Sequence, residues 1–192
     1  MPQQSWIPRW LGVLGSPIEG RVIIGPNWFA SVMGTAIVAS AGATLPIPVP
    51  GIITTAAWAL AVLLLVALLV FMPWNWARHP ENLRNLADDP IAIQFFGAPP
   101  MALLAVAGAT ILVGQQYLGQ GVAVGAAWVL WLIGTALGLL TAVAVPFRLF
   151  TALEVRHDGA FGGWLMPVVP PMVSAAVGAL LVPHTPAGEP RQ

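Results

Sequence analysis

Few side chains in this sequence could carry out chemistry, and they lie outside its long apolar tracts. The chain has no cysteine and three histidines, and the segment EVRHDG at 154–159 sets one histidine among carboxylates. One histidine and two acids at this spacing are more typical of a solvated turn than of a metal site. Walker, HExxH, GxSxG and GxGxxG motifs are absent, and no ionisable residue lies within a predicted membrane span to act as acid or base. We therefore predict that the protein is not an enzyme and binds no metal or cofactor.

The lack of charge inside the tracts also bears on transport. Proton-coupled pumps and cation sites usually keep a carboxylate or histidine within the membrane, and these tracts contain neither. They offer small residues, the amide of Asn27 and the hydroxyls of Ser31, Thr35 and Ser40. Such neutral groups suit a weakly held anion in a pore, and they also suit packing between membrane helices. Outside the tracts, Asp88 and Asp89 are expected to be solvated or to support the start of the following helix.

The elements that position these groups are predicted to be membrane helices. The chain is 58% hydrophobic and 7% charged, with mean hydropathy +0.83, whereas a soluble domain has about 25% charged residues. Its net charge is zero, so nucleic acid is not expected as a partner. Three uncharged tracts are long enough for two, two and one spans of roughly 20 residues. We predict an all-α integral membrane protein with transmembrane helices at 25–44, 52–72, 94–113, 122–147 and 163–182.

These five helices are of two kinds. The runs 56–71 and 122–143 contain no proline, whereas the first, third and fifth helices carry glycine and proline. Carbonyls freed by proline need a neighbouring helix or a watery cavity, so the irregular helices are expected to face inward; general enrichment of glycine and proline in membrane helices is the alternative. The alternation indicates hairpins that each pair an inner helix with an outer helix. The first four helices form two such hairpins, and the fifth would be the inner helix of a third. GxxxG patterns at 121–125 and 134–138 favour close helix packing over a dimer face.

Arginine positions predict the orientation. Six arginines precede the first helix or lie in the loops after the second and fourth helices, and Arg191 alone lies on the other side. The positive-inside rule then places the N-terminus in the cytoplasm of a multi-pass plasma-membrane protein. Residues 1–24 form a cytoplasmic leader, with an interfacial helix or a disordered segment as alternatives. Residues 25–183 form the transmembrane domain, and 184–192 form a tail on the outer side.

Three segments carry a resemblance to a known family: GPNWFASVMGTAIVAS at 25–40, HPENLRNLADDP running into FFGAPPMALL over 79–104, and FGGWLMPVVPPMVSAAVGALL at 161–181. Together they resemble the tellurite-resistance/dicarboxylate transporter family, which includes slow anion channels, malate permeases and sulfite exporters. That resemblance implies ten helices in five hairpins around a central pore, with pseudo-five-fold symmetry and inner helices kinked. This chain would be the N-terminal half, and no residue here corresponds to the family's gating phenylalanine on the ninth helix. The implied pore-lining or helix-kinking positions are Phe29, Gly34, Thr35, Pro99, Pro100, Pro170 and Pro171.

The resemblance implies transport of an anion: C4-dicarboxylate, sulfite, tellurite or a small inorganic anion. The protein would act as a channel or exporter, here as a truncated half. The alternative is a non-transporting membrane remnant or an assembly subunit that needs a partner half. The expected partners are the lipid bilayer, the anion, a C-terminal half and, by resemblance, two further copies in a homotrimer.

Overall fold

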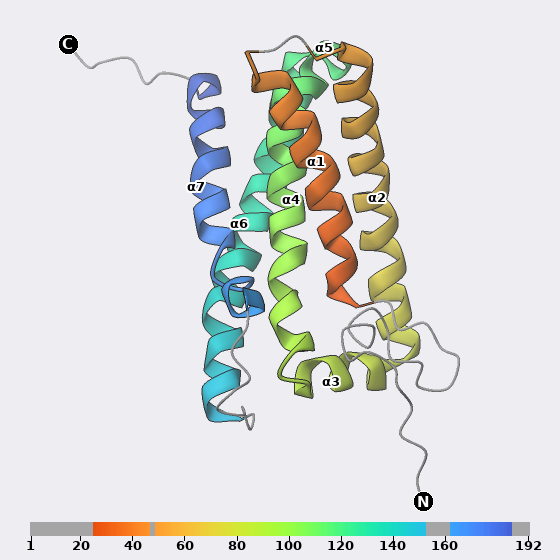
Figure 1. The fold of residues 1–192 in the computed structure, drawn as a ribbon, viewed down its shortest axis with the longest axis vertical. Helices are drawn as coiled ribbons and strands as arrows, with labels where there is room; N and C mark the ends of the chain where they lie inside the picture. Colours follow the sequence, from red (N-terminus) through yellow and green to blue (C-terminus); the bar gives the residue numbers. More distant parts are fainter. Residues whose placement is uncertain (1–24, 47–48, 153–161, 186–192) are drawn as a thin grey trace, which may run out of the picture.

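The computed structural model describes residues 25–46, 49–152 and 162–185, and this part of the chain contains helices and no strand (Figure 1). The all-α prediction is therefore confirmed. The α-helices are α1 (Phe29–Thr44), α2 (Gly51–Arg78), α3 (Pro80–Asp88), α4 (Ala98–Ala109), α5 (Gln115–Leu118), α6 (Gln120–Thr151) and α7 (Pro170–Leu181). Short 3₁₀ turns cover Pro26–Trp28, Ala92–Gly97, Gly162–Leu165 and Val182–His184, and a π-helical turn covers Thr110–Gly114.

Helix α4 lies at the centre of this arrangement. It contacts α1, α2, α6 and α7, and α1, α4 and α7 run in one direction while α2 and α6 run in the other (Figure 1). The short helix α3 lies across the end of the bundle at which α2 finishes and the run Ala92–Leu118 begins. This run corresponds to the third predicted helix and is called the third span below. Helices α1, α4 and α7, which correspond to the three predicted inner helices, are thus parallel to one another.

Three helical stretches among the described residues are long and apolar enough to cross a membrane: α2, the continuous run Ala92–Leu118, and α6. Helices α1 and α7 have 16 and 12 residues, which correspond to roughly 24 and 18 Å. The predicted count of five crossings therefore stays a prediction. The predicted fifth helix began at residue 163, whereas α7 begins at Pro170, because a proline fits the first turn of a helix better than its interior.

The two outer helices are longer than predicted. Helix α2 continues past Pro73 to Arg78, and α6 continues past Pro146 to Thr151. Each proline lies five residues before the end of its helix, so only the last turns lose a backbone hydrogen bond. Beyond Pro73, the indole of Trp76 stacks on Phe96 with ring centroids 5.9 Å apart, which packs the last turn of α2 against the start of the third span.

Burial separates the outer helices from the third span. Of the most apolar window in each, 17% is buried in α2, 17% in α6 and 78% in Ala92–Leu118. The outer helices expose large apolar side chains suited to lipid, among them Leu63, Val70, Phe71, Leu140, Val143 and Phe147. The third span is instead covered by neighbours, with small residues such as Ala102 and Ala109 in the core, which allow close helix approach.

The GxxxG pattern at 134–138 forms an internal contact. A Cβ on Gly134 would lie 2.9 Å from Cγ of Leu104, and one on Gly138 would lie 2.7 Å from Cβ of Pro170. These two glycines therefore bring α6 against α4 and α7. Gly121 and Gly125 carry the same pattern but have no atom within 4 Å of such a Cβ, so this second pair makes no close packing contact in the part of the chain described.

Alanine substitutions at these glycines should distinguish the GxxxG pattern that packs against other helices from the one that does not. We expect Gly138→Ala to destabilise the protein by about 1–3 kcal/mol, because the rigid ring of Pro170 cannot move aside for the new methyl group. Gly125→Ala should leave stability unchanged or raise it slightly, because alanine favours a helix over glycine. Thermal unfolding in detergent would measure both, and equal melting temperatures for the two variants would contradict the packing described.

Candidate functional site

Helices α4 and α7 start in the same way. Pro99, Pro100 and Met101 open the first turn of α4, and Pro170, Pro171 and Met172 open that of α7. Proline is favoured there because its fixed φ matches the helix and its missing N–H would have had no partner within the helix. A 3₁₀ turn, Ala92–Gly97, leads directly into α4, and Gly162–Leu165 precedes α7 by four residues. The two Pro-Pro-Met segments therefore both lie in the first turn of an α-helix, but only α7 begins after a break in the helical run.

The two starts meet at one glycine of α6. A Cβ on Gly138 would lie 2.7 Å from Cβ of Pro170 and 3.8 Å from Cβ of Pro100. Gly138 precedes Arg148 by ten residues in α6, which is roughly 15 Å along the axis. In a bilayer with a hydrocarbon core of about 30 Å, a junction at this distance from a charged helix end falls near mid-depth. The helical path is thus interrupted between Leu165 and Pro170, and α7 begins part-way along the bundle (Figure 1).

A second contact fixes the approach to this junction. A Cβ on Gly97 would clash with the carbonyl of Met166 and lie 2.7 Å from Cα of Pro167. The backbone before α7 therefore lies directly against the backbone before α4. This contact requires a glycine, because any side chain would push the two segments apart.

The electrostatics of the junction favour an anion without offering it many donors. The N-terminal end of a helix carries a partial positive charge, and α7 places that end at the junction, whereas the run that contains α4 begins earlier, at Ala92. Pro170 and Pro171 have no N–H, and the next two amides, of Met172 and Val173, both donate to the carbonyl oxygen of Val169. Attraction without free hydrogen-bond donors suits an ion that passes more than one that is held.

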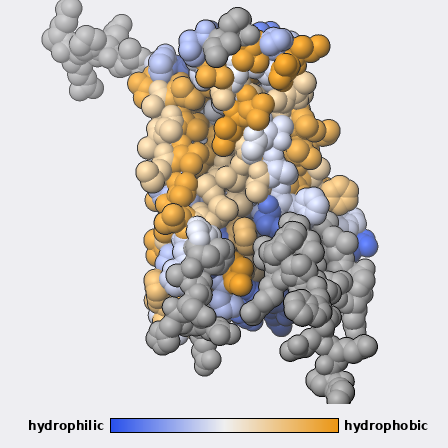
Figure 2. Space-filling view, viewed as in Figure 1, coloured by the Kyte–Doolittle hydropathy of each residue, from blue (hydrophilic) through white to orange (hydrophobic). Residues whose placement is uncertain are grey.

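Helix α1 supplies a different surface. Ser31 and Gly34 are exposed and Thr35 is half-buried, and a Cβ on Gly34 would have nothing within 4 Å. The hydroxyl of Thr35 donates to the carbonyl of Ser31 and that of Ser31 to the carbonyl of Trp28, both at 2.7 Å. These hydroxyls therefore present lone pairs outward unless they rotate. Figure 2 shows paler residues over α1 and α4 between more hydrophobic flanks over α2 and α7.

The structure brings some of the predicted site residues together and separates others. Pro100 and Pro170 are buried and meet at Gly138, while Pro99 and Pro171 are half-buried beside them. Phe29 is 2% exposed and packs in the core between α1, α2 and α4. Gly34 and Thr35 lie further along α1. Whether any of these positions lines a pore stays a prediction.

Sequence reasoning did not place Gly138 at the junction, and it did not identify Gln94 as a buried polar residue. The GxxxG pattern was a signal for Gly138, but it did not indicate which helices would meet there. Gln94 is 1% exposed, its Nε2 donates to the carbonyl of Pro90 at 2.7 Å, and its Oε1 has no partner among the described residues. No pattern in the sequence distinguishes this glutamine from those at 115 and 116.

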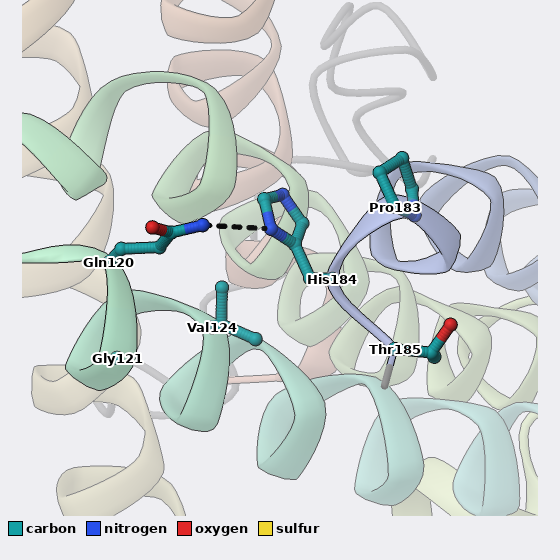
Figure 3. Close-up of a pocket in the computed structure, with 6 residues that line it drawn as sticks. All are labelled: Gln120, Gly121, Val124, Pro183, His184 and Thr185. Carbon is teal, nitrogen blue, oxygen red and sulfur yellow. Dashed lines mark hydrogen bonds between the residues drawn. The ribbon is translucent and has the colours of Figure 1, made fainter. Parts of the chain in front are cut away.

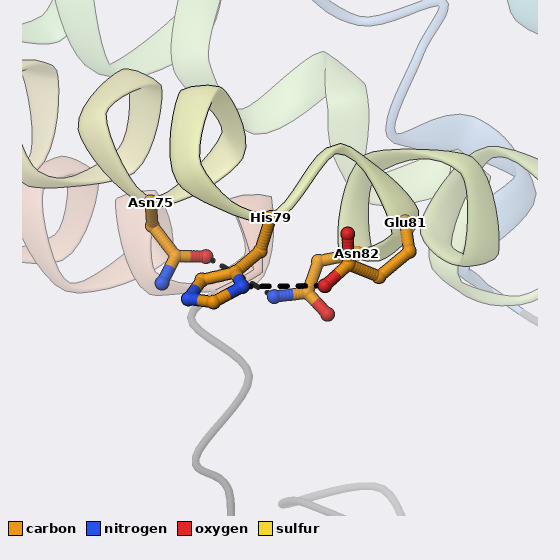
Figure 4. Close-up of polar contacts among 4 residues, drawn as sticks. All are labelled: Asn75, His79, Glu81 and Asn82. Atoms are coloured by element: carbon orange, nitrogen blue, oxygen red, sulfur yellow. Dashed lines mark hydrogen bonds and ion pairs between the residues drawn. The ribbon is translucent and has the colours of Figure 1, made fainter.

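The end of the bundle near α3 gathers the charged residues. Arg148 donates to Asp88 at 2.8 Å, which ties the end of α6 to α3, and Oδ1 of Asp89 accepts from the amides of Ile91 and Ala92 at 2.7 and 3.0 Å. The expectation that these acids support the start of the third span is confirmed for Asp89. Figure 4 shows the neighbouring contacts that close the turn from α2 to α3, His79 with Glu81 and Asn82 with Asn75.

A hollow marks the opposite end of the bundle, between the start of α6 and the turn after α7. It is lined by Gln120, Gly121, Val124, Pro183, His184 and Thr185, and Nε2 of Gln120 lies 3.5 Å from Nδ1 of His184 (Figure 3). No carboxylate is among these lining residues. Nowhere in residues 25–46, 49–152 and 162–185 do three or more possible ligands gather into a metal site, and the segment 154–159 lies outside the described residues.

Comparison with known proteins finds one matching family model and several transporters that are similar to this chain. The voltage-dependent anion channel family matches residues 24–192. A sulfite efflux pump of Arthroderma otae is 28% identical over 158 residues, 81% of this chain and 42% of the relative; a sulfite efflux pump of Trichophyton rubrum is 27% identical with the same coverage. An uncharacterized transporter of Methanocaldococcus jannaschii is 26% identical over 161 residues, 82% of this chain and 45% of the relative. The chain thus spans less than half the length of these relatives, and no solved structure matches it significantly.

The core position of Phe29 can be tested against its neighbour. We expect Phe29→Ala to lower stability by about 3–5 kcal/mol, because the lost ring leaves a cavity between three helices. Trp28→Ala should have a much smaller effect, since Trp28 is 50% exposed. Thermal unfolding in detergent would compare the two variants, and a larger loss for Trp28→Ala would show that Phe29 is not a core residue.

Proposed function

The chain belongs to the voltage-dependent anion channel family, and we propose that it forms part of the wall of a pore through which small anions cross a membrane. Sulfite is the anion we favour, because two of the relatives are sulfite efflux pumps. C4-dicarboxylate, tellurite and other small anions are the alternative substrates. Transport would be passive or driven by the anion gradient, since the spans carry no acid, base or histidine for a proton relay.

The junction at Gly138 is the observation that carries this proposal. Helix α7 begins there with its positive end near mid-depth, beside the point where the run Ala92–Leu118 passes from 3₁₀ to α-helix, and interrupted helices in transporters face anionic groups in this way. The prolines at both starts remove the donors that would bind an oxyanion tightly, and no charged side chain lies on α1, α4 or α7. The site should therefore lower the energy of an anion in the membrane and still release it.

The pore itself would need helices beyond those described. Helices α1, α4 and α7 would supply part of its lining, and α2 and α6 would face lipid. A further set of inner and outer helices would close the ring, and homotrimer formation would follow the resemblance. The end of the bundle with Arg78, Arg84 and Arg148 would lie in the cytoplasm of a plasma-membrane protein.

Two exposed glycines provide a test of this arrangement. Neither Gly34, on the proposed pore face of α1, nor Gly125, on the lipid-facing helix α6, has an atom within 4 Å of an added Cβ. We expect Gly34→Leu to reduce sulfite flux by about ten-fold or more by narrowing the pore, and Gly125→Leu to leave it unchanged. Both variants should retain the wild-type melting temperature.

Sulfite release would be measured from loaded proteoliposomes that contain this chain joined to the further helices that complete the pore. Release from wild-type vesicles no faster than from empty ones would reject the transport proposal and favour a remnant or an assembly subunit. Equal inhibition by both variants would reject the assignment of the α1 face to the pore while leaving transport intact.

A further inference from the structure

The third span changes helix type at one place. Regular helix α4 ends at Ala109, Thr110–Gly114 form a π-helical turn, and regular helix resumes at Gln115. Compared with an α-helix, a π-helical turn widens the hydrogen-bonded ring by one residue, and such turns occur frequently at functional sites. One extra residue rotates the next part of the helix by roughly 100° about the axis. The direction in which Gln115–Leu118 present their side chains therefore depends on this turn.

One tryptophan of the outer helix α2 contacts the turn at both ends. The indole Nε1–H of Trp58 donates to Oγ1 of Thr110 at 3.1 Å, and the same hydroxyl donates to the carbonyl of Val106 at 2.8 Å. A Cβ on Gly114 would lie 2.9 Å from Cζ2 of Trp58. The hydroxyl of Thr110 thus joins the indole to the carbonyl of Val106, in the last turn of α4.

The contact extends beyond the turn to Tyr117. Its ring stacks on the Trp58 indole with centroids 6.1 Å apart and an interplanar angle of 12°. Its hydroxyl lies 2.8 Å from Oγ1 of Thr55, on the same outer helix. Trp58 therefore contacts the first and last residues of the π-helical turn and one residue after it, so a change in the turn would have to break at least one of these contacts.

A second tryptophan makes a similar contact on a regular helix. Nε1 of Trp131, on α6, donates to the carbonyl of Ser174 at 2.8 Å, and a Cβ on Gly178 would lie 3.3 Å from its ring. Both tryptophans join an outer helix to the next inner one through an indole hydrogen bond and a glycine. Only the partner of Trp58 contains a π-helical turn, so Trp131 is a matched control.

We propose that Trp58 is a positioning residue: it holds the π-helical turn at Thr110–Gly114 in place, and the turn in turn sets how Gln115 and Gln116 face the anion path. This inference rests on the proposed transport function for its consequence, but the holding of the turn can be measured separately. Without the Trp58 contact, the helix opens locally at Thr110–Gly114 more often. Each opening exposes to water residues that are buried in the intact protein.

A single buried thiol can report this opening, because the chain contains no cysteine. Val113, within the turn, and Leu103, in the regular part of the same span, are each 3% exposed. Val113→Cys and Leu103→Cys would be introduced separately, the protein reconstituted in lipid vesicles, and the rate of labelling by a water-soluble maleimide measured. Each probe would be combined with Trp58→Phe, Thr110→Val, Thr110→Ser and Trp131→Phe.

We expect Trp58→Phe and Thr110→Val to raise the labelling rate of Val113→Cys by about five-fold, the effect of losing one hydrogen bond that closes a local opening. Thr110→Ser, which keeps the hydroxyl, and Trp131→Phe should label as slowly as the parent. The rate at Leu103→Cys should not change in any variant, and sulfite flux should fall only in the two variants that loosen the turn.

Unchanged labelling of Val113→Cys in both Trp58→Phe and Thr110→Val would overturn the proposal. An equal rise at Leu103→Cys, or with Trp131→Phe, would also overturn it, because the loosening would then be general. If labelling shows that the turn loosens as expected and vesicles with the wild-type protein release no sulfite, the proposed transport function is wrong. The proposal that Trp58 holds the turn in place is then still supported. If sulfite flux is present and unaffected by loosening, the link from the turn to the anion path fails.

Discussion

Lipid provides no hydrogen-bond partner for a backbone N–H or C=O, and this constraint explains where proline occurs in the chain. Pro26 opens a 3₁₀ turn, and the pairs 99–100 and 170–171 occupy first turns, where the missing N–H would have had no helical partner. Pro73 and Pro146 lie within the last turns of the outer helices. These seven prolines therefore lie near helix ends, where a missing N–H costs a helix fewer hydrogen bonds than in its interior.

The same constraint shapes the packing. Because the helix starts of α4 and α7 lie inside the bundle, they must contact protein rather than lipid, and Gly138 and Gly97 permit those contacts without side chains between the backbones. The outer helices expose large apolar residues on the surface that is suited to lipid. Trp58 and Trp131 connect each outer helix to the inner helix of the following hairpin through indole hydrogen bonds, which adds specific polar contacts to an otherwise apolar interface.

Much of this architecture could be predicted from composition and proline spacing, but its contacts could not. The sequence indicates apolar helices, the alternation of irregular and smooth runs, and the role of Asp89 before the third span. It does not distinguish the two GxxxG patterns, because residue spacing is identical and only the presence of a neighbouring helix differs. The start of α7 was misplaced because Pro170 can be interpreted as a kink within a helix or as its first residue. The π-helical turn has no compositional signal, and its contact with Trp58 joins residues 52 positions apart.

The helix start at the junction also bears on whether the proposed preference for anions would change with pH or with side-chain substitution. A field that arises from aligned peptide groups has no proton to gain or lose, so acidification or alkalinisation of either compartment leaves it unchanged. Point substitution of a side chain cannot reverse its sign, since that sign follows from the direction in which the chain runs. Regulation of such a pathway would therefore have to act on its width or its accessibility, because its charge is built into the backbone.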